Sequence, residues 1–451
     1  MLHLGRTAQK RLSNIGCSHV HSCVTTRRYS TRKTPPWRPS FALDEWVQRD
    51  ARPISLRQLT FFGRTLTEDR LLNSANYVRT ELPTRIAHRL RDMQTLPYIV
   101  LTNDNLSHVY ELYYKAFERF RKIPEVKTIE QNDKFCAVVK ETLKEHLTVI
   151  PRLVRGVIEV QDYMKPDSVD KFVTTLLRSR ISRRVIAEQH IALSDTFHEL
   201  WQYPGAEIHD DPNNADHVGE IFLRCNAREV IEGCAKVTRD LMQKMYGLDC
   251  QIPEIHIQGH LDATFPYILS HLEYIIGELL RNSIQATIEQ LASCNQTTPP
   301  SPIDVLICET PQHVIMRISD RGGGIPRDVL PHLWSFSKGP HRAVRLKNLN
   351  QVPRLAATMQ ELKGPPQKGR TNTQGAVTNL RRDSSLSSLA SRSPDMKLGI
   401  GLPMSKIYAE YWAGSLEIHS LEGYGVDAFL QISKLGNKNE HITTRATMDA
   451  V

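Results

Sequence analysis

The sequence predicts an α+β protein, in which an N-terminal four-helix bundle is followed by an α/β sandwich. Three observations support this prediction. Between residues 45 and 200, apolar side chains recur at helical spacing and strand-like alternation is scarce. Beyond residue 215, short extended segments alternate with helical stretches. One of those helical stretches carries Glu278 and Asn282, and two glycine clusters follow it in the chain.

The helical prediction for the first half depends on two amphipathic stretches. In the first, the apolar residues fall at i, i+3, i+4, i+7, i+8 and i+11, namely Val109, Leu112, Tyr113, Ala116, Phe117 and Phe120. Asn103, Asp104 and Asn105 precede them as candidate N-caps. In the second, the apolar residues are Phe172, Val173, Leu176, Leu177, Ile181, Val185 and Ile186. Long amphipathic helices with short connections predict a bundle over residues 40–205.

The second half shows a different pattern. The polar run HDDPNNADH at residues 209–217 marks the predicted boundary. A helical stretch near residues 227–246 then leads to short extended segments at 252–257, 302–307, 313–320 and 427–432. We therefore expect an α/β sandwich domain over residues 215–435 and a C-terminal tail over residues 436–451.

Residues 338–396 interrupt this domain. The stretch is rich in Ser, Arg, Lys, Gly and Pro, and it includes SSLSSLASRS at residues 384–393. Such a composition buries too little apolar surface to offset the entropy of ordering, so a disordered insertion is predicted. Two interpretations stay open: a mobile nucleotide lid that is regulated by phosphorylation, with Arg381-Arg382-Asp383-Ser384 as a basophilic site, or an insertion without regulatory role.

The net charge of +9 is concentrated at the N-terminus. Residues 1–43 carry eight basic side chains and no acidic one, and removing those eight from 58 leaves 50 basic against 49 acidic residues. The nearly neutral remainder argues against a nucleic-acid partner. An acid-free, Arg-rich leader predicts a mitochondrial transit peptide over residues 1–30 and hence a matrix protein. The alternative is a basic arm that binds an acidic partner.

Two further classes are excluded by composition. The eight cysteines include no C-x-x-C pair, which argues against both a zinc site and a disulfide framework. No apolar run approaches the roughly 18 residues of a membrane-spanning helix, so no membrane span is expected.

The candidate chemistry lies in three motifs. Glu278 and Asn282 are four residues apart and share one helix face, where a carboxylate and a carboxamide suit an attacking hydroxyl and a hydrated Mg²⁺. Asp320 ends a strand-like run before three glycines, where its carboxylate can accept the amino hydrogen of adenine. The sequence GIGLP at 399–403 opens a helix whose free N–H groups suit phosphates. In this order, the motifs predict a MgATP site unlike a P-loop.

The ordered motifs resemble the GHKL ATP-binding superfamily, and most closely the mitochondrial 2-oxo acid dehydrogenase kinases. The similarity extends over nearly the whole chain, with stretches at 54–64, 81–97, 149–163, 177–193 and 401–430. It implies a helical bundle followed by a GHKL-type ATP-binding domain. It also implies a protein-serine/threonine kinase that phosphorylates and inactivates the decarboxylase α subunit of its complex, docks on the lipoyl domain of the acyltransferase core, and forms a homodimer.

The resemblance also implies roles for individual residues. Glu278 matches the catalytic glutamate that orients the acceptor hydroxyl and takes its proton, and Asn282 matches the Mg²⁺ ligand. The implied ATP contacts are Glu278, Arg281, Asn282, Ser283, Gln285, Asp320, Gly322, Gly324, Ser337, Gly399, Ile400, Gly401 and Leu402. His146, Arg180 and Arg184 match a regulatory pocket for a 2-oxo acid carboxylate. Ordinary polar packing in a helix bundle is the alternative for those three.

The sequence departs from the family pattern at four positions. Tyr274 stands where pyruvate dehydrogenase kinases often have histidine, and Leu143 replaces an arginine used by some members. Lys397 stands where the last motif normally has an earlier glycine, where it would contact phosphate or stiffen the lid hinge. Val426 replaces a threonine that many members place near adenine.

Several functional alternatives remain. Tyr274 and Leu143 favour a branched-chain substrate, whereas the wider occurrence of the pyruvate dehydrogenase complex favours that complex, which we expect overall. A GHKL ATPase and a pseudokinase that has lost nucleotide binding through Lys397 are rivals. His198-Glu199-Leu200 resembles a histidine-kinase phosphoacceptor, although Pro204 lies one position too far along. The common protein-kinase fold is excluded, because its H-R-D, D-F-G and V-A-I-K signatures are missing.

Overall fold

The computed structural model describes residues 41–64, 66–202, 217–247, 250–294, 299–355, 396–436 and 438–440. By its internal contacts the chain divides into Met1–Trp37 and Arg38–Val451, and every element below belongs to the second unit. The predicted transit peptide, most of the polar run, the serine-rich part of the insertion and most of the C-terminal tail lie outside the described residues.

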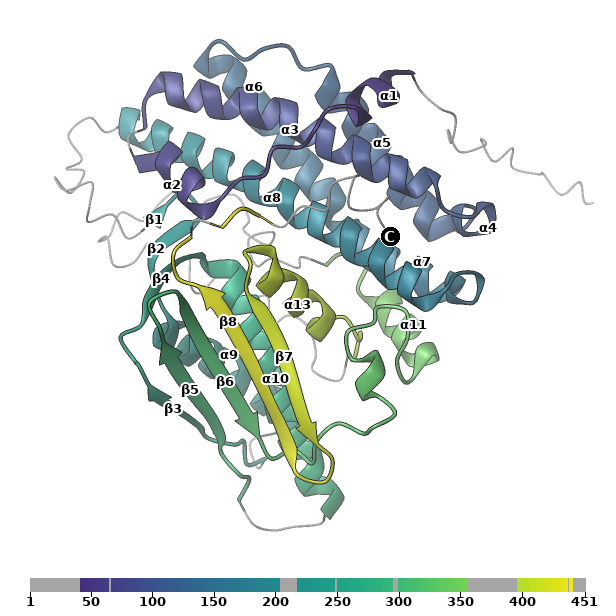
Figure 1. The fold of residues 1–451 in the computed structure, drawn as a ribbon, viewed down its shortest axis with the longest axis vertical. Helices are drawn as coiled ribbons and strands as arrows, with labels where there is room; N and C mark the ends of the chain where they lie inside the picture. The colour runs from purple at the N-terminus through teal and green to yellow at the C-terminus, as the bar shows by residue number, and fades with distance from the viewer. Residues whose placement is uncertain are drawn as a thin grey trace, which may run out of the picture. The chain divides into compact units, whose positions relative to one another are not determined.

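Residues 41–202, here called the helical region, form the predicted bundle (Figure 1). Its elements are α1 (Phe41–Val47), α2 (Leu56–Arg64), α3 (Glu68–Gln94), α4 (Tyr98–Leu101), α5 (Asp104–Arg121), α6 (Ile129–Glu145), η1 (His146–Thr148), α7 (Val149–Val160), η2 (Gln161–Tyr163) and α8 (Pro166–Gln202). The elements α6, η1, α7 and η2 follow one another without a break and form one continuous helical stretch. Together with α3, α5 and α8 this makes four long stretches, which pack against one another. The fold-class prediction is confirmed for this half.

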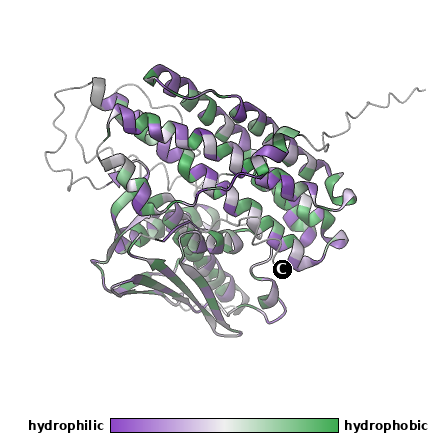
Figure 2. Ribbon diagram, turned by 45° about the horizontal axis from the view of Figure 1, so that its top comes forward, coloured by the Kyte–Doolittle hydropathy of each residue, from purple (hydrophilic) through white to green (hydrophobic). Residues whose placement is uncertain are grey.

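Local sequence accounts for these helices. Asn103 caps α5 as predicted, since its side chain accepts hydrogen bonds from the N–H groups of Asn105 and Leu106 at 3.0 and 3.2 Å. Thr128 caps α6 in the same way. Hydrophobic and hydrophilic residues interleave along each helix (Figure 2), and both predicted apolar stripes face the core, with only Leu112 half-buried. In the described residues no helix is long and apolar enough to cross a membrane.

Residues 217–440, here called the sheet region, form an α/β sandwich. The elements are β1 (His217–Val218), β2 (Ile221–Asn226), α9 (Ala227–Tyr246), β3 (Ile255–Gly259), β4 (Thr264–Ile268), α10 (Leu269–Cys294), β5 (Ile303–Glu309), β6 (His313–Asp320), η3 (Leu330–His332), α11 (Arg342–Gln351), α13 (Gly401–Tyr411), β7 (Ser415–Leu421) and β8 (Gly425–Ser433).

One mixed sheet provides the frame of the sheet region. Its five strands lie in the order β3-β5-β6-β8-β7, with β3 parallel to β5 and the other pairs antiparallel. Helices α10 and α13 cover one face of this sheet, and α9 packs beside α10 (Figure 1). The strands β1, β2 and β4 form a separate small antiparallel sheet. Strand β6 alternates between buried and half-buried residues, as expected for a sheet with one covered face.

Helix α11 is a difference from the sequence prediction. Its residues, Arg342–Gln351, lie inside the stretch predicted to be disordered. Only Arg345 and Leu349 of this helix are buried, so its apolar periodicity is too weak to be recognised. Hydrogen bonds from the buried Arg345 side chain stabilise it instead.

A buried ion cluster joins the C-terminal residues to both regions. The Arg85 guanidinium of α3 lies 3.1 Å from a carboxylate oxygen of Glu81 and 2.8 Å from one of Glu440. Glu440 also accepts from the Tyr411 hydroxyl at the end of α13 and from the Ile54 N–H at 3.2 Å. Burial alone would lower the pKa of Arg85, but the neighbouring Glu440 raises it above its usual range. Asn439 pairs with Ser55 in a β-bridge, and the Glu440 N–H donates to the Ile54 carbonyl. Residues 439–440 therefore contact both residues 54–55 and the end of α13.

Replacing Glu440 by alanine tests this cluster. Removing one partner of a buried ion pair leaves uncompensated charge, so we expect Glu440→Ala to lower the free energy of unfolding by about 3–5 kcal/mol. Denaturant titration of the purified protein measures this loss. Asp195→Ala is the control, because its pair with Lys140 is about half exposed and is expected to contribute at most about 1 kcal/mol. Equal, small losses of unfolding free energy in both variants would show that the Glu440 cluster does not stabilise the fold.

Candidate active site

Helix α10 carries the first motif on its buried side. The Glu278 carboxylate is 2% exposed, and its Oε2 accepts a hydrogen bond from Arg281 at 2.5 Å. Asn282 follows one turn later and is half-buried, and none of the described residues forms a hydrogen bond with its carboxamide. The two predicted residues therefore share one face, with Glu278 oriented by Arg281 and Asn282 open to a ligand.

Asp320 lies at the end of β6, beside the middle of α10. Its carboxylate accepts hydrogen bonds from the Ser283 hydroxyl at 2.8 Å and from the Gly322 N–H at 2.9 Å. Burial raises the pKa of Asp320, and these two hydrogen bonds partly oppose the shift. Each carboxylate oxygen retains a lone pair, so the group can still accept an amino hydrogen. Gly322 packs directly against Ala286 of α10, and Gly324 lies in the same turn.

The third motif meets the first at the start of α13. A Cβ atom on Gly401 would lie 2.2 Å from Oε2 of Glu278, so only glycine allows this approach of the two helices. No side chain caps the N-terminus of α13. In the described part of the chain nothing accepts a hydrogen bond from the N–H groups of Gly399 and Ile400. These free donors at a helix N-terminus, beside a carboxylate, fit the phosphates of ATP.

The structure also places three further residues of the predicted site. Leu402 lies in the first turn of α13 and is half-buried. Gln285 donates from its side chain to Glu289 at 2.8 Å. Ser337 donates its N–H and its hydroxyl to Asp170 of α8, at 3.3 and 3.4 Å, so a residue of the helical region holds it in place.

Two departures from the family pattern have structural explanations. Lys397 turns towards α10, where its ammonium group lies 3.0 Å from a carboxylate oxygen of Glu289. Both roles considered for this lysine, a phosphate contact and a stiffened hinge, stay predictions. Val426 is the strand partner of Asp320 across β6 and β8, which places it beside the predicted adenine contact.

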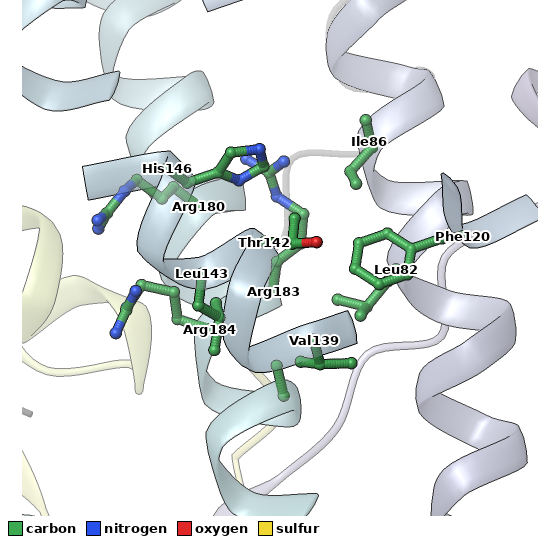
Figure 3. A pocket seen from close by; sticks show the side chains of 11 residues that line it. Leu82, Ile86, Phe120, Val139, Thr142, Leu143, His146, Arg180, Arg183 and Arg184 are labelled. Carbon is green, nitrogen blue, oxygen red and sulfur yellow. The ribbon is translucent and has the colours of Figure 1, made fainter. Parts of the chain in front are cut away.

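The predicted regulatory residues lie together in the helical region. His146, Arg180 and Arg184 line one cavity of about 20 Å³, together with Leu143 (Figure 3). Burial, together with the nearby arginines, lowers the pKa of His146 to about 3, so the imidazole is neutral. The cavity has room for about one water molecule.

Arg183 is a cavity residue that sequence reasoning missed. Figure 3 shows its guanidinium beside the His146 ring, whereas the guanidinium groups of Arg180 and Arg184 point away from Phe120. Arg183 also lies over the Tyr113 ring, 4.4 Å from the ring centroid. Arg183 could have been predicted from the sequence, because it lies three residues after Arg180 and residues three or four apart on a helix share one face.

Comparison with known proteins assigns the family. Residues 53–222 match the family described as mitochondrial branched-chain alpha-ketoacid dehydrogenase kinase. Residues 268–435 match the histidine kinase-, DNA gyrase B- and HSP90-like ATPase family, which supports ATP binding by the sheet region.

Similarity to whole proteins extends over both regions. The chain is 33% identical to the mitochondrial pyruvate dehydrogenase (acetyl-transferring) kinase 2 of Saccharomyces cerevisiae, over 91% of this chain and 86% of that protein. It is 29% identical to the mitochondrial pyruvate dehydrogenase (acetyl-transferring) kinase of Arabidopsis thaliana, over 88% and 94%. It is 26% identical to the mitochondrial pyruvate dehydrogenase (acetyl-transferring) kinase isozyme 4 of Homo sapiens, over 86% of this chain and 82% of that protein. The chain therefore belongs to the mitochondrial 2-oxo acid dehydrogenase kinase family, as its motifs predicted, and is an ATP-binding protein kinase.

Proposed function

We propose that this kinase phosphorylates serine on the decarboxylase α subunit of the pyruvate dehydrogenase complex in the mitochondrial matrix, and thereby inactivates the complex. One observation carries the proposal: relatives that are named pyruvate dehydrogenase kinases match this chain over more than four fifths of both lengths. The branched-chain alternative was based on Tyr274 and Leu143. Tyr274 is buried, with its ring 5.2 Å from that of Tyr408, and such packing is compatible with either substrate.

The geometry around Glu278 supports in-line phosphoryl transfer. Its carboxylate lies against Gly401, at the point where α13 offers free N–H groups to phosphates. Glu278 would accept the proton of the acceptor serine as the γ-phosphoryl group leaves ATP, and Arg281 would hold the carboxylate in its orientation. Asn282 would hold Mg²⁺, which neutralises charge on the phosphates when bound. Asp320 would select adenine through its free lone pairs.

The rival histidine-kinase function receives no support from the geometry. His198 lies near the end of α8, where its Nε2 contacts Asp133 at 2.7 Å across to α6. The predicted helix break at Pro204 lies outside the described residues. A GHKL ATPase remains the alternative that the nucleotide site itself does not distinguish, since both reactions begin with bound ATP.

Three partner assignments stay predictions from the resemblance. They are docking on a lipoyl domain, formation of a homodimer, and binding of a 2-oxo acid in the His146 cavity. The cavity supports the last of these, because three arginines and an imidazole line it and none of its lining residues is acidic, although Arg184 is ion-paired with Glu188 beside it. A ligand larger than a carboxylate group would require the lining side chains to move, given the volume of about 20 Å³.

Replacing Glu278 by glutamine tests the proposed base. Glutamine keeps the shape of the side chain but cannot accept the proton, so we expect kcat to fall by about 10²–10⁴-fold while the Kd for MgADP changes little. Phosphate transfer from labelled ATP gives kcat, and calorimetry gives Kd. Glu232→Gln, an exposed glutamate on α9, is the control and should behave as wild type. Transfer by Glu278→Gln at the wild-type rate would rule out the assigned role.

Offering the enzyme both complexes tests the substrate. We expect labelled phosphate on serine of the pyruvate dehydrogenase α subunit, with little transfer to the branched-chain subunit. Label that appears mainly on the branched-chain subunit would reverse the assignment of substrate. Label that appears only as free phosphate would identify an ATPase.

Replacing Asp320 by asparagine tests adenine recognition. The NH₂ group of the asparagine cannot accept a hydrogen bond. Either the amino group of adenine or the Ser283 hydroxyl therefore loses its acceptor. Because an unmade buried hydrogen bond costs about 1–3 kcal/mol, affinity for MgATP should fall by about 10–100-fold. Asp304→Asn, on the exposed side of β5, is the control. Unchanged affinity in Asp320→Asn would place adenine elsewhere.

A further inference from the structure

Arg345 of α11 has a buried guanidinium group. It is 5% exposed, and burial lowers its pKa, which Asp170 partly offsets. Within the described residues no carboxylate lies within ion-pair distance of Arg345. Its hydrogen-bond partners are four backbone carbonyl groups, which is an unusual environment for a buried cation.

Those four carbonyl groups belong to two segments of the chain, residues 336–338, which enter the stretch that carries α11, and residues 398–399, which leave it. On the entering side, Arg345 donates to the carbonyl oxygens of Phe336 at 2.8 Å and of Lys338 at 3.1 Å. On the leaving side, it donates to those of Leu398 at 3.2 Å and of Gly399 at 3.4 Å. One guanidinium group therefore holds together two segments that are separated by some sixty residues of sequence.

Glycine at position 399 makes this contact possible. Its φ is +68°, in the left-handed region, and a Cβ atom there would lie 2.5 Å from Nε of Arg345. The guanidinium group is therefore in direct contact with the backbone of the phosphate-binding motif.

The contact fixes the direction of the amide groups in that motif. In a trans peptide the C=O and N–H bonds point in opposite directions. When Arg345 binds the carbonyl groups of Leu398 and Gly399, the N–H groups of Gly399 and Ile400 must point away from it. These are the N–H groups that have no acceptor among the described residues.

The segment at Phe336 and Ser337 is also bound by the helical region. Asp170 of α8 accepts hydrogen bonds from the N–H groups of Phe336 at 2.9 Å and Ser337 at 3.3 Å. Asp170 and Arg345 thus bind the N–H and C=O groups of the same short segment. The motif is attached through this segment to the helical region.

We infer that Arg345 is a positioning residue of the kinase, whose buried guanidinium clasps residues 336–338 to residues 398–399 and aligns the N–H groups of Gly399 and Ile400 for the phosphates of ATP. The inference rests on the proposed nucleotide site. Arg345 acts through the backbone and touches neither the nucleotide nor the acceptor serine.

Substituting Arg345 tests the inference. In Arg345→Gln the clasp is lost, so the Kd for MgADP and the KM for ATP should rise about tenfold, which corresponds to about 1.4 kcal/mol, while the KM for the protein substrate stays unchanged. Arg345→Lys should be impaired to a similar degree, because one ammonium group cannot bind four carbonyl oxygens in a fixed fork. Calorimetry with MgADP and initial rates on the full-length protein give these constants.

Arg342→Gln is the matched control on the same helix. Arg342 attaches α11 to the helical region by donating to the Ile158 carbonyl at 2.8 Å and to Asp162 at 3.2 Å, and to none of the four carbonyl groups that Arg345 binds, so its variant should keep the wild-type KM and Kd. A purely structural role for Arg345 would lower the melting temperature and the active fraction without changing KM, which would overturn the inference.

Two other results would also overturn it. Wild-type affinity in Arg345→Lys alongside weak binding in Arg345→Gln would mean that the positive charge acts on the nucleotide directly. Failure of the wild-type protein to bind MgADP would overturn the proposed nucleotide site and this inference together, whereas wild-type binding that is unchanged in Arg345→Gln would overturn the inference alone.

Discussion

The contact between Glu278 and Gly401 is the constraint on which the candidate site depends. A side chain of any size on residue 401 would displace either the carboxylate or the start of α13, because a Cβ atom there would lie 2.2 Å from Oε2. The other parts of the site are placed by the same helix. Along α10, Ser283 binds Asp320 and Glu289 binds Lys397. A buried helix with many neighbours is a rigid support, and a phosphoryl-transfer site needs such rigidity because its catalysis consists mainly of positioning.

The sheet region is joined to the helical region by polar contacts at separate points. Glu440 binds Arg85 of α3 and Tyr411 of α13. Arg178 of α8 binds Glu410 of α13 at 2.8 Å. Asp170 of α8 binds the N–H groups of Phe336 and Ser337. Helix α8 therefore lines the His146 cavity and also contacts α13 and the segment at Phe336, which belong to the candidate nucleotide site. A ligand in that cavity influences the nucleotide site only as far as it binds two arrangements of α8 with different affinity.

The sequence was sufficient for the parts of the fold that follow from periodicity and short motifs. The stripes at residues 109–120 and 172–186 predicted α5 and α8, because burial of one helix face repeats at fixed spacing. Helix α11 could not be predicted, since Arg345, one of its two buried residues, binds the carbonyl groups of Leu398 and Gly399, which lie more than fifty residues further along the chain. Glu440 joins a buried cluster across 355 residues for the same reason: nothing local marks a residue whose partner, here Arg85, is distant.

The sequence motifs identified the chemical groups of the candidate site, but they did not predict which residues surround some of these groups. Lys397 illustrates this. Sequence comparison marked it as a lost glycine beside the phosphates, and two outcomes were open, whereas the position of Glu289 one helix away directs the ammonium group to α10. Substrate choice illustrates the opposite limit. Transfer of a phosphoryl group to serine needs the same base, metal ligand and phosphate donors whichever complex supplies the serine. Discrimination between the pyruvate and branched-chain complexes must therefore arise at surfaces that contact the partner protein, so a buried residue such as Tyr274 carries little information about it.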